Sequence, residues 1–301
     1  MALPAAHDGQ AALGEVPDVG GDDAVRKLNA RHRNILLVQA LTAGLDTQVT
    51  PNGSVEVRRD GNQIAVLTSP FANGANAAAV ASQLQPVIDR RWLRQERMNE
   101  ILEQQTDLIS FLSLVHPISA VTHPMLMVLL DAVHAATVQI EVAAKHGLSV
   151  IRPGALSAAV NPVIQTPSHS ACPSGHATEA FALAFTLEAL IFGQANQDLR
   201  LIAARIEENR IVAGVHFEHD GYMGRRLAAA LAAVFAQRMG VASTAPAQAD
   251  IWSEPGENGV FASNQDGTPG LSPQQVQVNQ PNGGSAILAS VVKMAKLELG
   301  N

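Results

Sequence analysis

The sequence predicts a mainly α-helical protein with a small β-hairpin near its N-terminus. Apolar residues recur at helical spacing over most of the chain from residue 75 to about residue 240, whereas Val55–Leu67 alternates between apolar and polar side chains. Hydrophobic residues make up 47% of the 301 residues and charged residues 16%, a balance that indicates a packed globular protein with a sizeable core.

The predicted elements follow one another along the chain. Residues 1–21 are rich in Gly, Pro and Asp, which predicts a flexible N-terminal arm. Helical spacing then covers residues 23–45, and a hairpin at about 54–68 turns at Asp60-Gly61, a pair that tolerates positive φ. The remaining predicted helices cover 75–114, with a break near Pro86, and then 122–146, 174–193, 197–214 and 220–239.

The ends of the helical region are also predicted. Gly147 and Gly240 suit helix ends, because glycine adopts left-handed backbone angles without strain. From residue 242 to 284 the chain is rich in Pro, Gly, Asn, Gln and Ser, which predicts an extended tail. The last segment, SAILASVVKMAKLEL, is an amphipathic helix that either docks back on the chain or packs on another subunit, which makes a homodimer plausible. We therefore expect an arm (1–21), one helical domain (22–241) and a tail with a terminal helix (242–301).

Charge and composition exclude several classes of function. The net charge of −7 argues against a nucleic-acid surface and against attraction to a membrane of anionic lipid, so any bound anion must be drawn by a local cluster of cations. The N-terminus lacks the pattern of a signal peptide, and no apolar run reaches 18 residues without interruption. We expect a soluble protein, cytoplasmic rather than secreted or periplasmic unless a signal was removed. A single cysteine, Cys172, excludes an internal disulfide.

Three groups of residues carry the chemistry. The first holds Lys145 and Arg152, whose spacing would place both on one face of an unbroken helix, although Gly147 is expected to end that helix. The second is PSGH, residues 173–176. Its serine suits a helix N-cap, its glycine lets the backbone approach a ligand closely, and the first amides of the following helix are free to bind an anion.

The third group is NRIVAGVHFEHD, which contains Arg210, His216 and Asp220. The histidine and the aspartate are four residues apart, so on a helix the carboxylate can reach one imidazole nitrogen and fix the tautomer of the other. Together the three groups supply three cations, a hydroxyl, free amides and two histidines. This set suits a tetrahedral oxyanion such as phosphate or vanadate, with one histidine attacking or ligating the central atom and the other, His176, moving the proton on the opposite side.

A zinc site is the competing interpretation. His169, Cys172 and His176, or His216 and His219, offer nitrogen and sulfur ligands, but there is no CxxC pair and the neighbouring cations would repel a divalent ion. The scattered histidines outside these groups are assigned structural roles: His7, His32, His116, His123, His134 and His146.

The three groups, in this order and with this internal spacing, resemble the signature shared by vanadium-dependent haloperoxidases and type 2 phosphatidic-acid phosphatases (the PAP2 superfamily). The resemblance covers about residues 120–240 and departs at Asn209, where the signature usually has Ser. It implies the helical bundle of these enzymes, with residues 22–241 as the catalytic domain. We expect Asn209 to be tolerated, because Asn also hydrogen-bonds locally.

The resemblance also implies a role for each residue. Lys145, Arg152, Arg210, Ser174 and the Gly175 amide would hold the equatorial oxygens of vanadate, with phosphate as a competing occupant. His216 would be the axial ligand of the vanadium, or the nucleophile toward a phosphoester, and Asp220 would orient it. His176 would be the acid–base partner, and Lys145 would also polarise a bound peroxide.

Two reactions fit such a pocket. One is oxidation of halide, bromide or iodide rather than chloride, by hydrogen peroxide; the other is phosphomonoester hydrolysis through a phosphohistidine. His169 favours oxidation, since it lies where the bromoperoxidases that this stretch resembles also carry a histidine and where it would tune halide oxidation. The scarcity of Tyr, Trp and Cys also favours oxidation, because few side chains would react with a released oxidant. Cys172 argues against it, because a thiol beside the pocket is vulnerable to peroxide. We expect a haloperoxidase of the soluble bacterial type, with a soluble acid phosphatase as the alternative.

Overall fold

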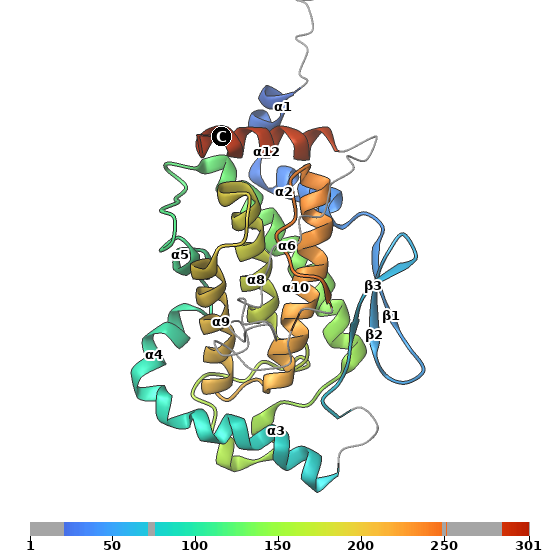
Figure 1. The fold of residues 1–301 in the computed structure, drawn as a ribbon, viewed down its shortest axis with the longest axis vertical. Helices are drawn as coiled ribbons and strands as arrows, with labels where there is room; N and C mark the ends of the chain where they lie inside the picture. The colour runs from blue at the N-terminus through green and yellow to red at the C-terminus, as the bar shows by residue number, and fades with distance from the viewer. Residues whose placement is uncertain (1–20, 72–75, 249–250, 252–284, 301) are drawn as a thin grey trace, which may run out of the picture.

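Helices packed around a central apolar helix make up most of the protein (Figure 1), so the predicted mainly α fold is confirmed. The computed structural model describes residues 21–71, 76–248, 251 and 285–300. The predicted arm, apart from Gly21, and most of the predicted extended tail lie outside these residues. The elements are α1 (Asp22–Lys27), α2 (Ala30–Thr42), β1 (Leu45–Val49), β2 (Val55–Arg59), β3 (Asn62–Leu67), α3 (Ala77–Asp89), η1 (Arg90–Leu93), α4 (Arg94–Glu103), α5 (Ile109–Leu112), α6 (Pro124–Leu148), α7 (Pro153–Leu156), η2 (Ala158–Val160), α8 (Gly175–Leu187), η3 (Glu188–Phe192), α9 (Gln197–Val212), α10 (Glu218–Met239) and α12 (Ala286–Glu298).

The central helix is α8, which packs against α6, α9 and α10. Every residue of α8 is buried except His176 and Glu179, which are partly exposed. A helix that is apolar on all sides must be surrounded by other elements to be stable in water. The contact with α10 is close at Gly224, where an added Cβ would lie 2.9 Å from the Ala177 Cβ and from the Ser174 carbonyl oxygen. The N-terminal ends of α8 and α10 are thereby held side by side, and both carry predicted site residues.

The predicted hairpin is present, and a third strand joins it. The strands β1, β2 and β3 form an antiparallel sheet in that order, with Val55 opposite Leu67 and Asp60 and Gly61 at positive φ in the turn. We did not predict β1, whose sequence LDTQV is largely exposed and lacks the apolar alternation on which the hairpin was recognised. The sheet lies beside α6 and α10 (Figure 1).

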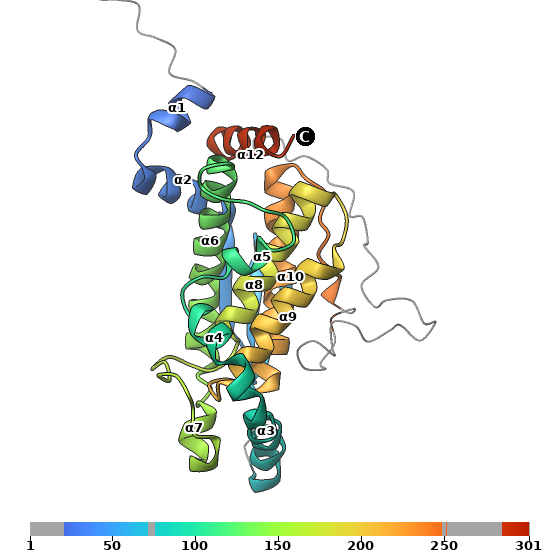
Figure 2. The ribbon, with the colours of Figure 1, turned by 90° about the vertical axis from the view of Figure 1, so that its left-hand side faces the viewer.

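The predicted helix over 75–114 is divided into several pieces, but its first break is not at Pro86. Proline 86 lies inside α3, and the backbone tightens only afterwards, in the 3-10 turn η1. The Arg90 guanidinium in that turn donates a hydrogen bond of 2.9 Å to the Pro86 carbonyl. The chain then continues through α4 and α5 along the outside of α9 (Figure 2).

The helix α6 does not end at Gly147 as predicted. It continues to Leu148, and the left-handed residue that ends it is Ser149, with φ 50°. Gly147 serves packing instead: an added Cβ would lie 2.7 Å from a methyl group of Val55 and 3.0 Å from one of Val49. Glycine is therefore needed here because the sheet crosses the helix closely. Gly240 ends α10 as predicted, with φ 67°.

The terminal helix α12 docks back on its own chain, which is the first of the two predicted arrangements. It lies across the end of the bundle opposite α3 (Figures 1 and 2) and packs against α6. The Glu298 carboxylate accepts hydrogen bonds of 3.0 Å from the backbone amides of Met125 and Leu126 at the start of α6. A negative charge at a helix N-terminus is stabilising, so this contact joins the end of the chain to the helix that carries Lys145.

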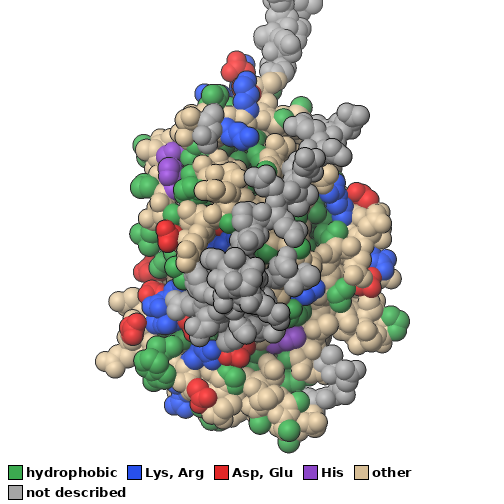
Figure 3. Space-filling view, viewed as in Figure 1, with side chains coloured by type: hydrophobic (Ala, Val, Ile, Leu, Met, Phe, Trp, Pro, Cys, Tyr) green, Lys and Arg blue, Asp and Glu red, His purple; other side chains and the backbone are tan. Residues whose placement is uncertain are grey.

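Among the described residues, one helical segment, Pro124–Leu156, is long and apolar enough by composition to cross a membrane. Its most apolar window is half buried inside the protein, and its main part, α6, packs against α2, α8, α12 and β1. The core helix of a soluble protein meets the same criteria. On the face seen in Figure 3, the described acidic, basic and hydrophobic side chains are interspersed.

Candidate active site

The structure brings Lys145 and Arg152 to the same loop although they do not share a helix. Lys145 lies in the last turn of α6, and the chain turns at Ser149 before Arg152 caps α7. The Lys145 ammonium donates to the Pro173 carbonyl, and the Arg152 Nε donates to the His169 carbonyl at 3.1 Å. Both cations therefore meet the segment that leads into PSGH. Both are almost fully buried, at 2% and 6% exposure.

Ser174 occupies the predicted N-cap position of α8, but its side chain does not cap the helix. Its hydroxyl is buried and has no hydrogen-bond partner among the described residues. Its amide donates to the Asp220 carbonyl at 2.8 Å, which ties the start of α8 to the start of α10. A buried hydroxyl without a partner is costly, so this group is available to a ligand.

Gly175 has a function that the sequence did not predict. An added Cβ would lie only 2.6 Å from Glu141 Oε1 and 3.2 Å from Glu179 Oε1. The missing side chain thus makes room for two carboxyl groups behind the PSGH turn. Its amide stands at the start of α8, where backbone N–H groups have no intrahelical acceptor.

His216 and Asp220 form the predicted pair, although His216 precedes α10 and does not lie on it. The Asp220 Oδ2 is 3.2 Å from His216 Nδ1 and also accepts a hydrogen bond of 2.9 Å from the Phe217 amide. If Nδ1 donates to Asp220, Nε2 keeps its lone pair, and this nitrogen lies 3.0 Å from Arg152 Nη1. The neutral imidazole thus carries a lone pair on Nε2, which accepts from Arg152 here and can act as a ligand or nucleophile once Arg152 donates to another group instead.

Arg210 lies in the last turn of α9 and is 1% exposed. Its Nη2 donates to the Ile101 carbonyl at 3.0 Å and to Gln104 Oε1 at 3.2 Å, both outside the bundle helices that carry the motifs. Its Nε and Nη1 are buried and have no partner in the part of the chain that the structure describes. Asn209, where the sequence departs from the signature, shares a partner with Arg210. Its side-chain amide donates to Glu100 at 2.9 Å and to Gln104 at 3.0 Å.

The pKa shifts show that these groups share one electrostatic environment. Burial lowers the pKa of His216 well below its usual value of 6.5, and the charges of Arg152, Lys145, His176 and Arg210 lower it further, in that order. All four groups thus act on a single imidazole. Neutral imidazole is the form that can donate a lone pair, so the arrangement keeps His216 ready for that use.

The same environment acts on the other members of the site. Burial, and after it the charge of Arg210, lowers the pKa of His176 to about 4, so this imidazole is neutral at pH 7. Burial lowers the pKa of Arg210 to about 10 and raises that of Asp220 to about 7. Each shift favours the uncharged form, which is what buried groups show when opposite charge is insufficient nearby.

The acidic partner of His176 was not predicted from the sequence, and the structure supplies two carboxyl groups. Glu179 lies one turn after His176 on α8, and Glu141 lies one turn before Lys145 on α6, 3.7 Å from its ammonium. Burial raises the pKa of Glu141 to about 8. His134, assigned only a structural role from sequence, lies 2.9 Å from Glu179 Oε2. The spacings 176/179 and 141/145 were the available signals, whereas no spacing pointed to His134 or Gln104.

The remaining predicted residues lie at the edge of this site. His169 is exposed, with Nδ1 3.2 Å from Arg152 Nη2, so it stands at the outer side of the pocket. Cys172 is fully buried, with its sulfur 3.6 Å from the Thr68 carbonyl. His219 binds the same carbonyl at 2.8 Å and points to the sheet rather than to His216. Within the described ranges, no three His, Cys, Asp or Glu side chains are grouped as ligands of a metal ion.

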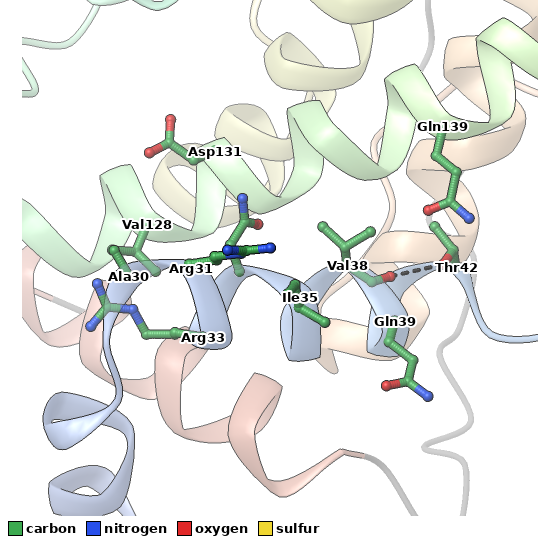
Figure 4. A pocket seen from close by; sticks show the side chains of 11 residues that line it. Ala30, Arg31, Arg33, Ile35, Val38, Gln39, Thr42, Val128, Asp131 and Gln139 are labelled. Atoms are coloured by element: carbon green, nitrogen blue, oxygen red, sulfur yellow. Dashed lines mark hydrogen bonds between the residues drawn. The ribbon is translucent and has the colours of Figure 1, made fainter.

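One hollow lies beside these groups, and a second lies farther along α6. A cavity of about 170 Å³ adjoins His176 and is also lined by Glu179, His134 and the segment 104–109. A larger hollow of about 710 Å³ lies between α2 and α6, and Figure 4 shows its walls, which include Arg31 and Arg33. The motif residues do not line the larger hollow.

Residues 125–242 match the family model of the PAP2 superfamily. The chain carries a PAP2 superfamily domain. No curated protein matches the chain. The PAP2 domain begins in the first turn of α6 and ends just after α10, so it contains every residue of the three motifs. Superfamily members are generally enzymes, either phosphatases or haloperoxidases. Residues before the PAP2 domain complete the site, because Ile101 and Gln104 hold the Arg210 guanidinium.

Proposed function

We propose that this protein is a vanadate-dependent haloperoxidase that oxidises bromide or iodide with hydrogen peroxide to hypohalous acid. The observation that carries the proposal is a set of buried donors that lack protein partners: the Ser174 hydroxyl and two nitrogens of Arg210 have none among the described residues. Arg152 lies 3.0 Å from His216 Nε2 in the same site. Donors of this kind fit a tetrahedral oxyanion, because its oxygens accept several hydrogen bonds and its charge offsets the buried cations.

The residues that would hold vanadate follow from this set. Lys145, Arg152 and Arg210 would balance its charge, while the Ser174 hydroxyl and the Gly175 amide would donate to its oxygens. His216 Nε2 would ligate the vanadium. Phosphate has the same shape and charge, so it would compete for the same donors. Bound vanadate would supply a Lewis-acidic centre that activates hydrogen peroxide for oxygen transfer to a halide.

The chain's own residues then have separable tasks. Asp220 accepts a hydrogen bond from His216 Nδ1. This bond holds the imidazole in the tautomer whose lone pair is on Nε2, the nitrogen that does not face Asp220. His176 is neutral at pH 7, because its pKa is about 4, and can accept a proton from peroxide at the site. Lys145 and Arg152 would stabilise negative charge on the reacting oxygens in a buried environment, where such interactions are strong.

Three observations favour oxidation over hydrolysis. Cys172 was the feature against a peroxidase, but its side chain is fully buried, and burial raises the pKa of its thiol well above 9.0. The thiol is therefore a poor nucleophile toward peroxide or hypohalite. The second observation is the neutral state of His176, which suits a base better than an acid. The third is the exposed His169 beside Arg152, placed where a halide would approach the buried cations.

The alternative is a phosphatase, and the cavity of about 170 Å³ beside His176 favours it. A leaving alcohol has room there. In this reaction His216 Nε2 would attack phosphorus, the bond from phosphorus to the ester oxygen would break, and a protonated His176 would donate its proton to that oxygen. Water would then cleave the phosphohistidine. Binding of a dianion would favour the protonated state of His176 that this step requires.

A paired assay tests the proposal. Purified protein is incubated with bromide, hydrogen peroxide and a cyclic dione, and separately with an aryl phosphate, each with and without added vanadate. We expect vanadate-dependent bromination that phosphate inhibits competitively. Turnover of the aryl phosphate alone, inhibited by vanadate, would replace the proposal by the phosphatase alternative. His216→Ala should abolish either reaction, and His219→Ala, three residues away and turned toward Thr68, is the matched control.

We also propose that the enzyme works in solution and not in a membrane. The apolar surface of α6 is used in packing against α2, α8, α12 and β1, and the helix carries the buried Glu141 and Lys145 in its second half. Sedimentation of the full chain with and without lipid vesicles tests this: we expect the protein in the supernatant in both cases, and recovery with the vesicles would contradict the proposal.

A further inference from the structure

Two residues interrupt the buried surface of the central helix, and they lie on the same side of it. His176 and Glu179 are the partly exposed residues of α8, one turn apart, and both line the cavity of about 170 Å³. His134 of α6 lines the same cavity, with its Nε2 2.9 Å from Glu179 Oε2. The His134 side chain is 42% exposed, whereas that of Glu179 is 15% exposed. A proton-carrying group at the surface thus lines the same cavity as one at the active site.

The charges of these groups are complementary: Glu179 is acidic, and the two histidines can carry a positive charge. The hydrogen bond from His134 lowers the pKa of Glu179 below its usual value in spite of burial, and the same bond raises the pKa of His134. Glu179 is thus an ionised acceptor between two imidazoles. It raises the pKa of His176 while burial, Arg210 and Lys145 lower it.

We propose that Glu179 and His134 form a proton relay that connects His176 with solvent through this cavity. The inference rests on the proposed function, since it assigns His176 a proton-transfer role, and it applies to the oxidation and to the hydrolysis alike. A cavity of about 170 Å³ has room for several water molecules, since one water occupies about 30 Å³ of liquid.

The transfer can be written bond by bond. After His176 has accepted a proton, one N–H bond of its imidazolium breaks and the proton passes through cavity water to the Glu179 carboxylate. It then moves from the carboxyl oxygen to Nε2 of neutral His134 in the tautomer that carries its hydrogen on Nδ1, and the partly exposed ring releases the Nδ1 proton to buffer. Proton exchange with water returns His134 to that tautomer for the next transfer. When the reaction consumes a proton, the same bonds form and break in the reverse order. No electrons move and no further reactant is needed.

Other titratable and charged groups surround the relay and contribute to the pH dependence of proton transfer through it. Helix α6 contributes Asp131, Glu141 and Lys145, and α9 contributes Arg210, which lowers the pKa of His176. The segment after α4 contributes Asp107, which lines the cavity, and the Gln104 backbone, which hydrogen-bonds to His176. Asp131 also lines the larger hollow between α2 and α6 (Figure 4), so the relay reaches solvent on that side of α6.

The first test uses His134→Ala and exogenous imidazole in whichever assay shows turnover. We expect kcat to fall by about tenfold at low buffer concentration, less than the roughly 10²–10⁴ that direct acid–base catalysis contributes, because His134 acts through His176. The KM for the substrate should stay unchanged, and added imidazole should restore kcat, because a diffusing base replaces the missing ring. His146→Ala, an exposed histidine on the same helix, is the matched control and should show neither effect. A kcat of His134→Ala that is unchanged, or that imidazole does not restore, would overturn the relay while leaving the proposed function intact.

The second test does not depend on activity. In protein with labelled histidines and without vanadate, the NMR signals of His176 should shift when His134 titrates, because Glu179 couples the two rings. Glu179→Gln should remove this response and lower the pKa of His134, and Glu179→Asp should restore part of both. If His176 fails to respond to His134 in the wild type, the relay is wrong, whether or not the protein turns over either substrate.

Discussion

Binding of a tetrahedral oxyanion should stabilise the folded protein strongly, and the effect should depend on Arg210. Its Nε and Nη1 have no partner among the described residues, so each can form a new hydrogen bond to the anion. A charge-assisted hydrogen bond contributes about 1.5–3 kcal/mol. Two of them correspond to at least about 100-fold in affinity, at about 1.4 kcal/mol per tenfold. Arg210→Met should therefore raise the Kd for vanadate or phosphate at least about 100-fold.

The thermal shift follows from this affinity. A ligand at 100 times its Kd adds about 2.7 kcal/mol to the free energy of unfolding. In a domain of this size, 1 kcal/mol raises Tm by about 2–4 °C, so wild-type protein should gain about 5–10 °C. At the same concentration Arg210→Met would be near its own Kd and gain only about 1 °C. The ligand-free Tm need not fall, because the substitution also removes a buried charge.

The assay is a thermal melt with vanadate, with phosphate, and with sodium chloride at matched ionic strength. Arg91→Met is the control for loss of one positive charge, since Arg91 is exposed in η1 and donates to the Ala159 carbonyl outside the pocket. It should keep the full shift. An equal shift in Arg210→Met and wild type, or no shift in wild type beyond that of chloride, would refute the assigned anion pocket.

Three further predictions concern single residues. Gly147→Ala should not raise Tm and should in most of the range lower it, because a Cβ 2.7 Å from a Val55 methyl group costs about 1–3 kcal/mol of overpacking against roughly 1 kcal/mol of helix propensity. Ala143→Gly, exposed on the same helix, measures the propensity alone. A Tm that Gly147→Ala raises by as much as Ala143→Gly lowers it would contradict the close packing. Cys172 should react with a thiol reagent only after denaturation, since it is fully buried; rapid labelling of the native protein would show that it is accessible. The pKa of His176 is about 4 in the folded protein against 6.5 for a free histidine. The free energy of unfolding should therefore fall as the pH drops from 6.5 toward 4, by at most about 3 kcal/mol. Denaturant titrations of His176→Gln should show a smaller loss over that range.

The elements that could be predicted are those whose conformation follows from their own residues. The hairpin was recognisable from its alternation and from Asp60-Gly61, both residues of which are at positive φ in the turn. The strand β1 was not recognisable, because it is an edge strand whose pairing partner β2, not its own composition, makes it a strand. Gly147 was misinterpreted for a related reason: its role depends on Val49 and Val55, which are distant in sequence.

The candidate site likewise contains residues that could be predicted from local spacing and residues that could not. Motif spacing gave the three cations, the two imidazoles and Asp220, since each motif is a short segment whose internal geometry is local. It did not give Gln104 or His134, because these reach the site from other elements. The roles of the motif residues in vanadate binding stay predictions until a ligand is bound.

The charges within the site favour an anion as its occupant. Arg152 and Arg210 form no ion pair with a carboxylate in the part of the chain that the structure describes, although each is at most 6% exposed. Lys145 lies near Glu141, but the pKa of that carboxyl group, about 8, leaves it largely protonated at pH 7. Burying a charge without its partner costs several kcal/mol per ion, which is much of the stability of a domain. The chain as a whole is negative, so this positive excess is local to the pocket. A guest with two or three negative charges offsets it, whereas a halide with one charge and no hydrogen-bonding oxygens does so only in part, and a dianion should therefore outcompete chloride at equal ionic strength.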